Sequence, residues 1–179
     1  MPKGLKETSS QIVISFTTTE TAPNTFTAER IDLQLNALDN EVFVVTGVKM
    51  DLGIPEFTDG VGSGRHATFA TLSKQDITNS DNRTLGNPSV FASDDVQIST
   101  EVPVGQDFGL VVLYQNEDSD APYNVEYLDI IATPDFYVNI NSVNQTTARS
   151  VVGKLYGYRA RADSSTYAAL VQSELLSNN

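Results

Sequence analysis

The sequence predicts an all-β protein, an antiparallel jelly-roll sandwich or barrel that ends in one short helix. Three observations lead to this fold class. Apolar and polar residues alternate in many short segments, which is the pattern of strands with one buried face. Turn-forming residues separate these segments at short intervals. A helical spacing of apolar residues is almost absent before residue 160 and is present after it. Together they favour roughly eight to ten strands in a sandwich or barrel.

Two kinds of strand are expected. Short continuous apolar runs rich in β-branched residues suit strands buried on both faces, and they occur at residues 11–16, 42–45 and 110–114. Alternating segments suit strands with one wet face, and they occur at residues 31–36, 48–52, 125–131 and 137–140, with a further strand expected at 68–72. The expected turns are residues 37–41, 79–82, 86–88, 93–95 and 116–120. Residues 53–65 contain Pro55 and four glycines and are expected to form a loop.

The two ends of the chain differ from this pattern. Residues 1–10 lack any periodicity and are expected to form an N-terminal arm, followed by the jelly-roll domain over residues 11–162 and a helical extension over residues 163–179. Tyr167, Leu170, Val171 and Leu175 follow the spacing i, i+3, i+4, i+8, which places them on one face of a helix. Asp163 or Ser164 can cap that helix. The stripe can dock on its own barrel, on a neighbouring copy or on a lipid surface.

The amino-acid composition excludes most kinds of catalytic and metal-binding site. The chain has no cysteine and a single histidine, His66, so thiolate sites are excluded and a hydroxyl nucleophile has only one candidate imidazole base. We therefore expect a protein that is not an enzyme. A formal net charge of −12 argues against direct binding to nucleic acid, and no apolar run reaches the ~18 residues of a membrane span. We expect no cofactor, with one alternative left open: the acidic turn at 116–120 either holds a structural calcium ion or is a solvated hairpin turn.

Charge is unevenly placed along the chain. Residues 84–148 contain ten acidic residues and no Lys or Arg, whereas residues 149–161 contain four basic residues and no acid. Either these stretches are neighbours within one copy, or the acidic loops of one copy meet the basic strand of another. The second arrangement uses unlike patches, which close into rings or shells. The basic candidates for this interface are Arg149, Lys154, Arg159 and Arg161, and the acidic candidates are Asp94, Asp95, Glu117, Asp118 and Asp120.

Aromatic and apolar residues near the C-terminus extend this candidate interface. Tyr156 and Tyr158 stand two apart and therefore share one face of a strand, and tyrosine is favoured at interfaces because it offers a broad contact with a polar tip. Capping of the core edge, with the hydroxyl groups in water, is the alternative. Tyr167, Leu170 and Val171 of the helical stripe are added to the candidate interface.

Two segments carry a resemblance to a known family. They are residues 39–46, DNEVFVVT, and residues 154–161, KLYGYRAR, which lead into YAALV at 167–171. With the all-β pattern of residues 11–162, the chain resembles the single jelly-roll capsid proteins of tailless icosahedral viruses of bacteria and archaea, in which a membrane lies beneath the shell. The resemblance implies a structural coat protein that assembles with itself or with a related coat protein into an icosahedral shell.

The same resemblance implies where the protein works. It implies synthesis in the host cytoplasm and incorporation into the virion, close to the viral membrane and without direct contact with the genome. Jelly rolls also host other functions, so a carbohydrate- or receptor-binding β-sandwich module is the alternative. Such a module would use Tyr114, Tyr123 and Tyr127, with nearby acids, as a platform for a sugar.

Overall fold

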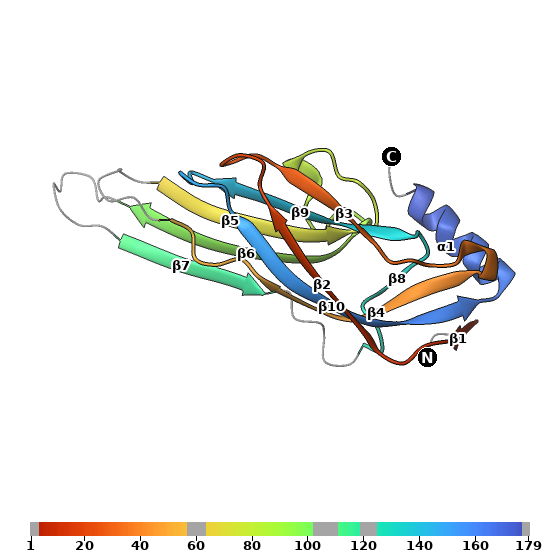
Figure 1. Ribbon diagram of the computed structural model, residues 1–179. Helices are drawn as coiled ribbons and strands as arrows, with labels where there is room; N and C mark the ends of the chain where they lie inside the picture. The colour runs from red at the N-terminus through yellow and green to blue at the C-terminus, as the bar shows by residue number, and fades with distance from the viewer. Residues whose placement is uncertain (1–3, 57–63, 102–110, 119–124, 177–179) are drawn as a thin grey trace.

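The protein is described by a computed structural model over residues 4–56, 64–101, 111–118 and 125–176. In these residues ten strands form two five-stranded antiparallel sheets, followed by one α-helix, as Figure 1 shows. Sheet A consists of β1 (Leu5–Glu7), β2 (Ile12–Thr19), β10 (Ser150–Ala162), β4 (Glu41–Asp51) and β8 (Asp129–Ile131). Sheet B consists of β3 (Thr27–Asp32), β9 (Asp135–Val143), β5 (Gly64–Ser73), β6 (Val90–Glu101) and β7 (Val111–Asp118). The short 3₁₀ helices η1 (Ala37–Asp39) and η2 (Ser80–Asn82) lie in connections, and the C-terminal helix is α1 (Ser164–Leu176).

The order of the strands is that of a jelly roll. Strand β2 pairs with β10, β3 with β9, β4 with β8, and β5 with β6. The chain is therefore one long nested hairpin whose successive strand pairs alternate between sheet A and sheet B, and β7 extends sheet B at one edge. The predicted fold class, an antiparallel jelly roll with one short C-terminal helix, is confirmed.

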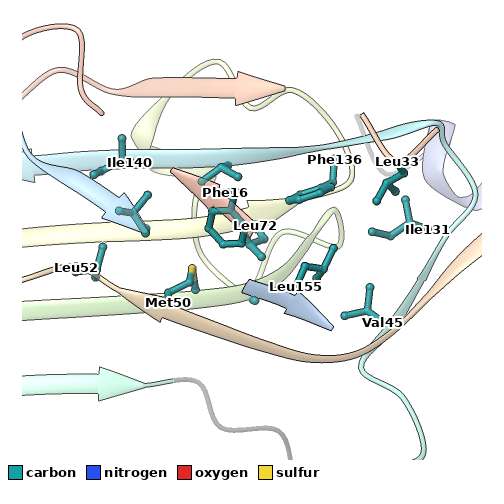
Figure 2. Close-up of a cluster of buried hydrophobic side chains, with 14 of the residues drawn as sticks. Phe16, Leu33, Val45, Met50, Leu52, Leu72, Ile131, Phe136, Ile140 and Leu155 are labelled. Atoms are coloured by element: carbon teal, nitrogen blue, oxygen red, sulfur yellow. The ribbon is translucent and has the colours of Figure 1, made fainter. Parts of the chain in front are cut away.

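The main core fills the space between the two sheets. Figure 2 shows the side chains of Phe16, Leu72, Phe136 and Leu155 pointing toward one another from both layers. The rings of Phe16 and Phe136 meet edge to face, with 6.2 Å between their centroids. The odd-numbered residues from 151 to 157 on β10 face this core, and Gly157 lies so close to β4 that an added Cβ would sit 2.3 Å from the carbonyl oxygen of Val44. The alternation of the sequence thus corresponds to inward and outward faces.

A second apolar cluster lies on the outer face of sheet A, under α1. Its buried members are Leu5, Val42, Val44, Ala132, Ala160 and Ala162. Tyr167, Leu170 and Val171 of α1 pack against it, so the helical stripe docks on its own sheet. The predicted cap is present, because the Asp163 carboxylate accepts a hydrogen bond from the backbone N–H of Thr166 at 2.7 Å.

Several expected boundaries need correction. Residues 1–10 are not wholly an arm, since Leu5–Glu7 pairs with residues 160–162 of β10 and Leu5 is buried. Strand β3 covers residues 27–32 rather than 31–36, because Gln34 adopts a left-handed φ of 54° that breaks the strand. The expected turn at 93–95 lies inside β6, and of the expected strand at 125–131 only Asp129–Ile131 is paired. Residues 57–63 of the expected loop lie outside the described residues.

Candidate interaction surfaces

Three of the four basic interface candidates make contacts within one copy. Arg149 donates to the backbone oxygen of Ile54 at 2.6 Å and lies 3.9 Å from the Glu56 carboxylate. Arg159 donates to the backbone oxygen of Leu33 at 3.1 Å. Both arginines thus contact other segments of the same chain. These contacts favour an intramolecular role over an intermolecular one.

Arg161 is the third of these residues. It forms an ion pair with Asp39 of η1 at 2.5 Å, and it also donates to the backbone oxygen of Asp39. Both side chains are about half exposed, so the pair is worth little in water. Two of the four basic residues at 149–161, Arg149 and Arg161, therefore lie beside carboxylates of the same chain, those of Glu56 and Asp39.

Lys154, the fourth basic candidate, differs from the arginines. It is exposed on the outer face of sheet A, and its direct cross-strand partner on β4 is Lys49, which is also exposed. Among the described residues, no ion pair joins either lysine to a carboxylate. Lys49 was not among the sequence-derived candidates, because nothing in the sequence says that β4 and β10 are neighbours.

The two lysines lie in a regular open surface that we call the lysine face. It consists of nine outward positions on three neighbouring strands, which α1 leaves uncovered. These are Val13, Ser15 and Thr17 on β2, Tyr156, Lys154 and Val152 on β10, and Gly47, Lys49 and Asp51 on β4. A shallow hollow of about 430 Å³ lies over this part of the sheet. Counting Asp51, the lysine face carries a formal charge of +1 on a chain of −12.

Tyr156 and Tyr158 share the outer face of sheet A, as their spacing predicts, but they lie in different surroundings. Tyr156 borders the lysine face and lies over Gly47, whose added Cβ would be 3.8 Å from the tyrosine ring. Tyr158 packs against the apolar cluster under α1, where burial, followed by the charge of Glu7, raises the pKa of its hydroxyl. Only Tyr156 is placed at an open surface.

Four of the five acidic candidates meet on two neighbouring strands of sheet B. Asp94 is the direct cross-strand partner of Asp118, and Asp95 is the partner of Glu117. Consecutive residues of a strand point to opposite faces, so Asp94 and Asp95 lie on different faces of sheet B and the four acids do not form one surface. Like charges in this arrangement destabilise a strand pair. Asp120 lies outside the described residues, as does part of the acidic turn proposed for calcium, residues 116–120. The charge run of the sequence is thus gathered at β6 and at the edge strand β7.

A cationic stack that sequence reasoning missed lies beside Asp95. The guanidinium groups of Arg83 and Arg65 lie 4.0 Å and 5.1 Å from the centroid of the Phe69 ring, and Phe69 is the cross-strand partner of Asp95. Burial, followed by the charge of Arg65, lowers the pKa of Arg83, and Asp95 opposes that shift. Asp94 is only 6% exposed.

The helical candidates Tyr167, Leu170 and Val171 are engaged with their own sheet, and the residue that fixes the helix is one the sequence analysis did not select. Glu174 is 3% exposed, and its carboxylate accepts the backbone N–H groups of Ala132 at 2.8 Å and Thr133 at 3.1 Å. Glu174 lies seven residues after Tyr167, on the same face of the helix as Leu170 and Val171. This position on the apolar stripe is the sequence signal that could have revealed it.

The residues considered for catalysis, metal binding or sugar binding do not come together at one site. His66 is buried, and its Nδ1 lies 3.0 Å from the backbone oxygen of Asn144. In the part of the chain that the structure covers, no group of three or more His, Asp or Glu side chains is placed to hold a metal ion. Tyr114 is 56% exposed on β7, whereas Tyr127 packs under α1 on the other sheet, and Tyr123 lies outside the described residues.

No family model matches the chain, and no curated protein matches it. Among the described residues, no helix combines the length and apolar character that crossing a membrane requires.

Proposed function

We propose that this protein is a structural coat protein that assembles, with copies of itself or with a related coat protein, into an icosahedral viral shell. Its work is then to tile a surface rather than to catalyse a reaction. On this proposal the protein is made in the host cytoplasm and resides in the virion, where it lies close to a viral membrane and leaves the genome to other components.

The observation that carries this proposal is the jelly-roll order of the strands. The nested pairing of β2 with β10, β3 with β9, β4 with β8 and β5 with β6 is an arrangement that viral capsid domains use repeatedly. Fold alone does not fix function, so a second feature supports the choice. Lys49 and Lys154 are direct partners on the outer face of sheet A, where they give part of the surface a charge opposite in sign to that of the whole chain.

The test is the state of association of the purified full chain. Sedimentation velocity over a wide range of protein concentration and salt, followed by negative-stain electron microscopy, is expected to show oligomers that grow into closed particles. A protein that stays monomeric under all these conditions, alone and with the other coat components of its source, contradicts the proposal. A monomer that binds a glycan selectively on an array would identify the binding-module alternative.

A further inference from the structure

We propose that the outer edge of strand β2 pairs with the same edge of a second copy, so that the two copies share one continuous antiparallel sheet. This inference rests on the proposed function and deepens it, because it names a surface through which copies associate. The edge belongs to sheet A. There β2 pairs with β10 on one side, and no other strand in the described part of the chain pairs with it.

Every second residue of β2 directs its backbone groups toward this outer edge. The N–H of Glu20 donates to the carbonyl oxygen of its cross-strand neighbour Arg149 at 2.9 Å. Hydrogen-bonded and non-hydrogen-bonded pairs alternate along an antiparallel ladder, so the even-numbered residues of β2 bond to β10. The odd-numbered residues direct their N–H and C=O groups away from β10. These residues are Val13, Ser15, Thr17 and Thr19, and all four are exposed.

Strand β2 lacks the features that ordinarily keep an exposed edge from pairing. Such edges are blunted by shortness, by charged side chains, by proline or by a β-bulge. Strand β2 has eight residues, IVISFTTT, and its register with β10 runs without a shift. The other edge strands are protected, because β1 and β8 have three residues each and β3 and β7 contain charged residues. Among the described edge strands, β2 alone is therefore open to pairing.

A second copy suits this edge because the edge is uncharged and complementary to itself. Two chains of net charge −12 repel each other, whereas β2 contains no charged residue. Two identical strands pair antiparallel about a two-fold axis. An axis beside Phe16 places Val13 opposite Thr19 and Ser15 opposite Thr17, which are β-branched and hydroxyl pairs that stabilise antiparallel sheets. This overlap would form about eight backbone hydrogen bonds between the copies.

Pairing at this edge also covers apolar surface and involves no ion pair. Val13 is 49% exposed, and a strand paired with β2 would lie about 4.8 Å away and cover one side of that residue. Salt does not screen hydrogen bonds or apolar contacts of this kind, but it does screen the repulsion between two acidic chains, with a Debye length of ~8 Å at physiological ionic strength. Association of the copies is therefore expected to strengthen as salt rises.

The contact is isologous, because both copies contribute the same strand. An isologous contact closes on itself and produces a dimer rather than an open chain. On the proposed function, this dimer is the unit from which the shell is built, and other surfaces join one dimer to the next.

Substitutions at Thr17 test the edge while leaving the bonds between β2 and β10 in place. Thr17→Pro removes one outward N–H, and proline is tolerated in an edge strand where the N–H faces solvent. Two proline-variant copies would lose two of the shared hydrogen bonds, so dimers are expected to need roughly tenfold or more higher protein concentration in sedimentation velocity. Thr17→Ala is the matched control, because it keeps the N–H, and it is expected to associate like the unmodified protein.

A second pair of variants tests the edge without altering any backbone group. Thr17→Lys places a charge at the edge, which is a way in which natural strands prevent such pairing, and it is expected to weaken association as the proline variant does. Thr78→Lys is its control, because it makes the same change of charge at an exposed position outside β2. Circular dichroism checks that every variant is folded.

Amide hydrogen exchange read by NMR reports on the edge directly. The amides of the odd-numbered residues 13–19 are expected to exchange more slowly in the associated protein than in the monomer, whereas the even-numbered residues are protected in both. The inference is overturned if the unmodified protein associates and both edge variants associate equally well, or if the odd-numbered amides gain no protection. The proposed function survives that result. An unmodified protein that stays monomeric under every condition overturns both.

Discussion

Replacement of Glu174 with alanine is expected to release α1 from sheet A. The Glu174 carboxylate accepts two backbone N–H groups, from Ala132 and Thr133, in a site that is 3% exposed to water. A buried donor left without an acceptor costs about 1–3 kcal/mol, so two of them cost about 2–6 kcal/mol. Removal of the buried negative charge of Glu174 offsets part of this cost, because the charge no longer has to be taken out of water on folding. We therefore expect a net loss of about 2–3 kcal/mol.

Amide hydrogen exchange is the direct assay, because it reports on α1 separately from the rest of the fold. A loss of about 2–3 kcal/mol corresponds to roughly 30- to 150-fold faster exchange in α1. Glu174→Gln keeps one acceptor oxygen and should lose less. Leu176→Ala is the matched control, since Leu176 lies on the same helix but is 60% exposed. Exchange in α1 that is as slow in the alanine variant as in the Leu176 control would refute the anchoring role of Glu174.

The same residue gives the docking of α1 a definite pH dependence. Burial raises the pKa of Glu174, while the backbone N–H of Ala132 and the charge of Lys74 oppose the shift. Because the pKa is higher in the folded state than in the unfolded state, this group's contribution to stability is full below the unfolded pKa and is lost as pH rises through the folded pKa. The stability of the unmodified protein relative to Glu174→Gln is therefore expected to increase on mild acidification. Paired thermal melts across that pH range measure it.

Three further predictions concern the fold and its loops. Gly157→Ala should severely destabilise the protein in thermal melts, because its Cβ would lie 2.3 Å from the Val44 carbonyl oxygen, whereas Gly47→Ala, with its nearest atom at 3.8 Å, should be tolerated. The hydroxyl groups of Thr146 and Thr147 lower the pKa of Glu56 to about 2, so the Glu56 contribution to stability should persist on acidification and be lost only as pH falls through that value. An NMR titration of Glu56 checks this, and an ordinary midpoint near 4.5 would contradict it. Arg161→Ala should cost less than about 1 kcal/mol in denaturant unfolding, because its ion pair with Asp39 is half exposed; a larger loss would show that the pair is structural.

The fold class could be predicted because its signals are local. The apolar runs at 11–16 and 42–45 fall in β2 and β4, and the helical spacing after residue 160 corresponds to α1 with Asp163 as its cap. The expectation that residues 11–16 are buried on both faces was wrong, because β2 has one exposed face, on which Val13 is 49% exposed. The ends of the strands depended on the backbone conformation of single residues, which the alternation of apolar and polar residues does not reveal. The left-handed Gln34 ends β3 early, although Leu33 still points into the core. The short β1 pairs only because β10 continues far enough to receive it.

The candidate surfaces were predicted only in part, because they depend on which strands become neighbours. The outward phase of Lys49 is visible in the alternation of residues 48–52, but its pairing with Lys154 requires the register of β4 against β10. The acidic residues were selected by charge, and the structure then places Asp94 and Asp95 opposite Asp118 and Glu117. Arg159 was assigned to an interface because its charge was counted, whereas its partner is an uncharged backbone oxygen, that of Leu33.

The most direct test of the whole account is cryo-electron microscopy of the purified protein under the salt conditions in which it sediments fastest. The account predicts a closed particle built from many copies of the jelly roll. Fields that contain only single jelly rolls would contradict it.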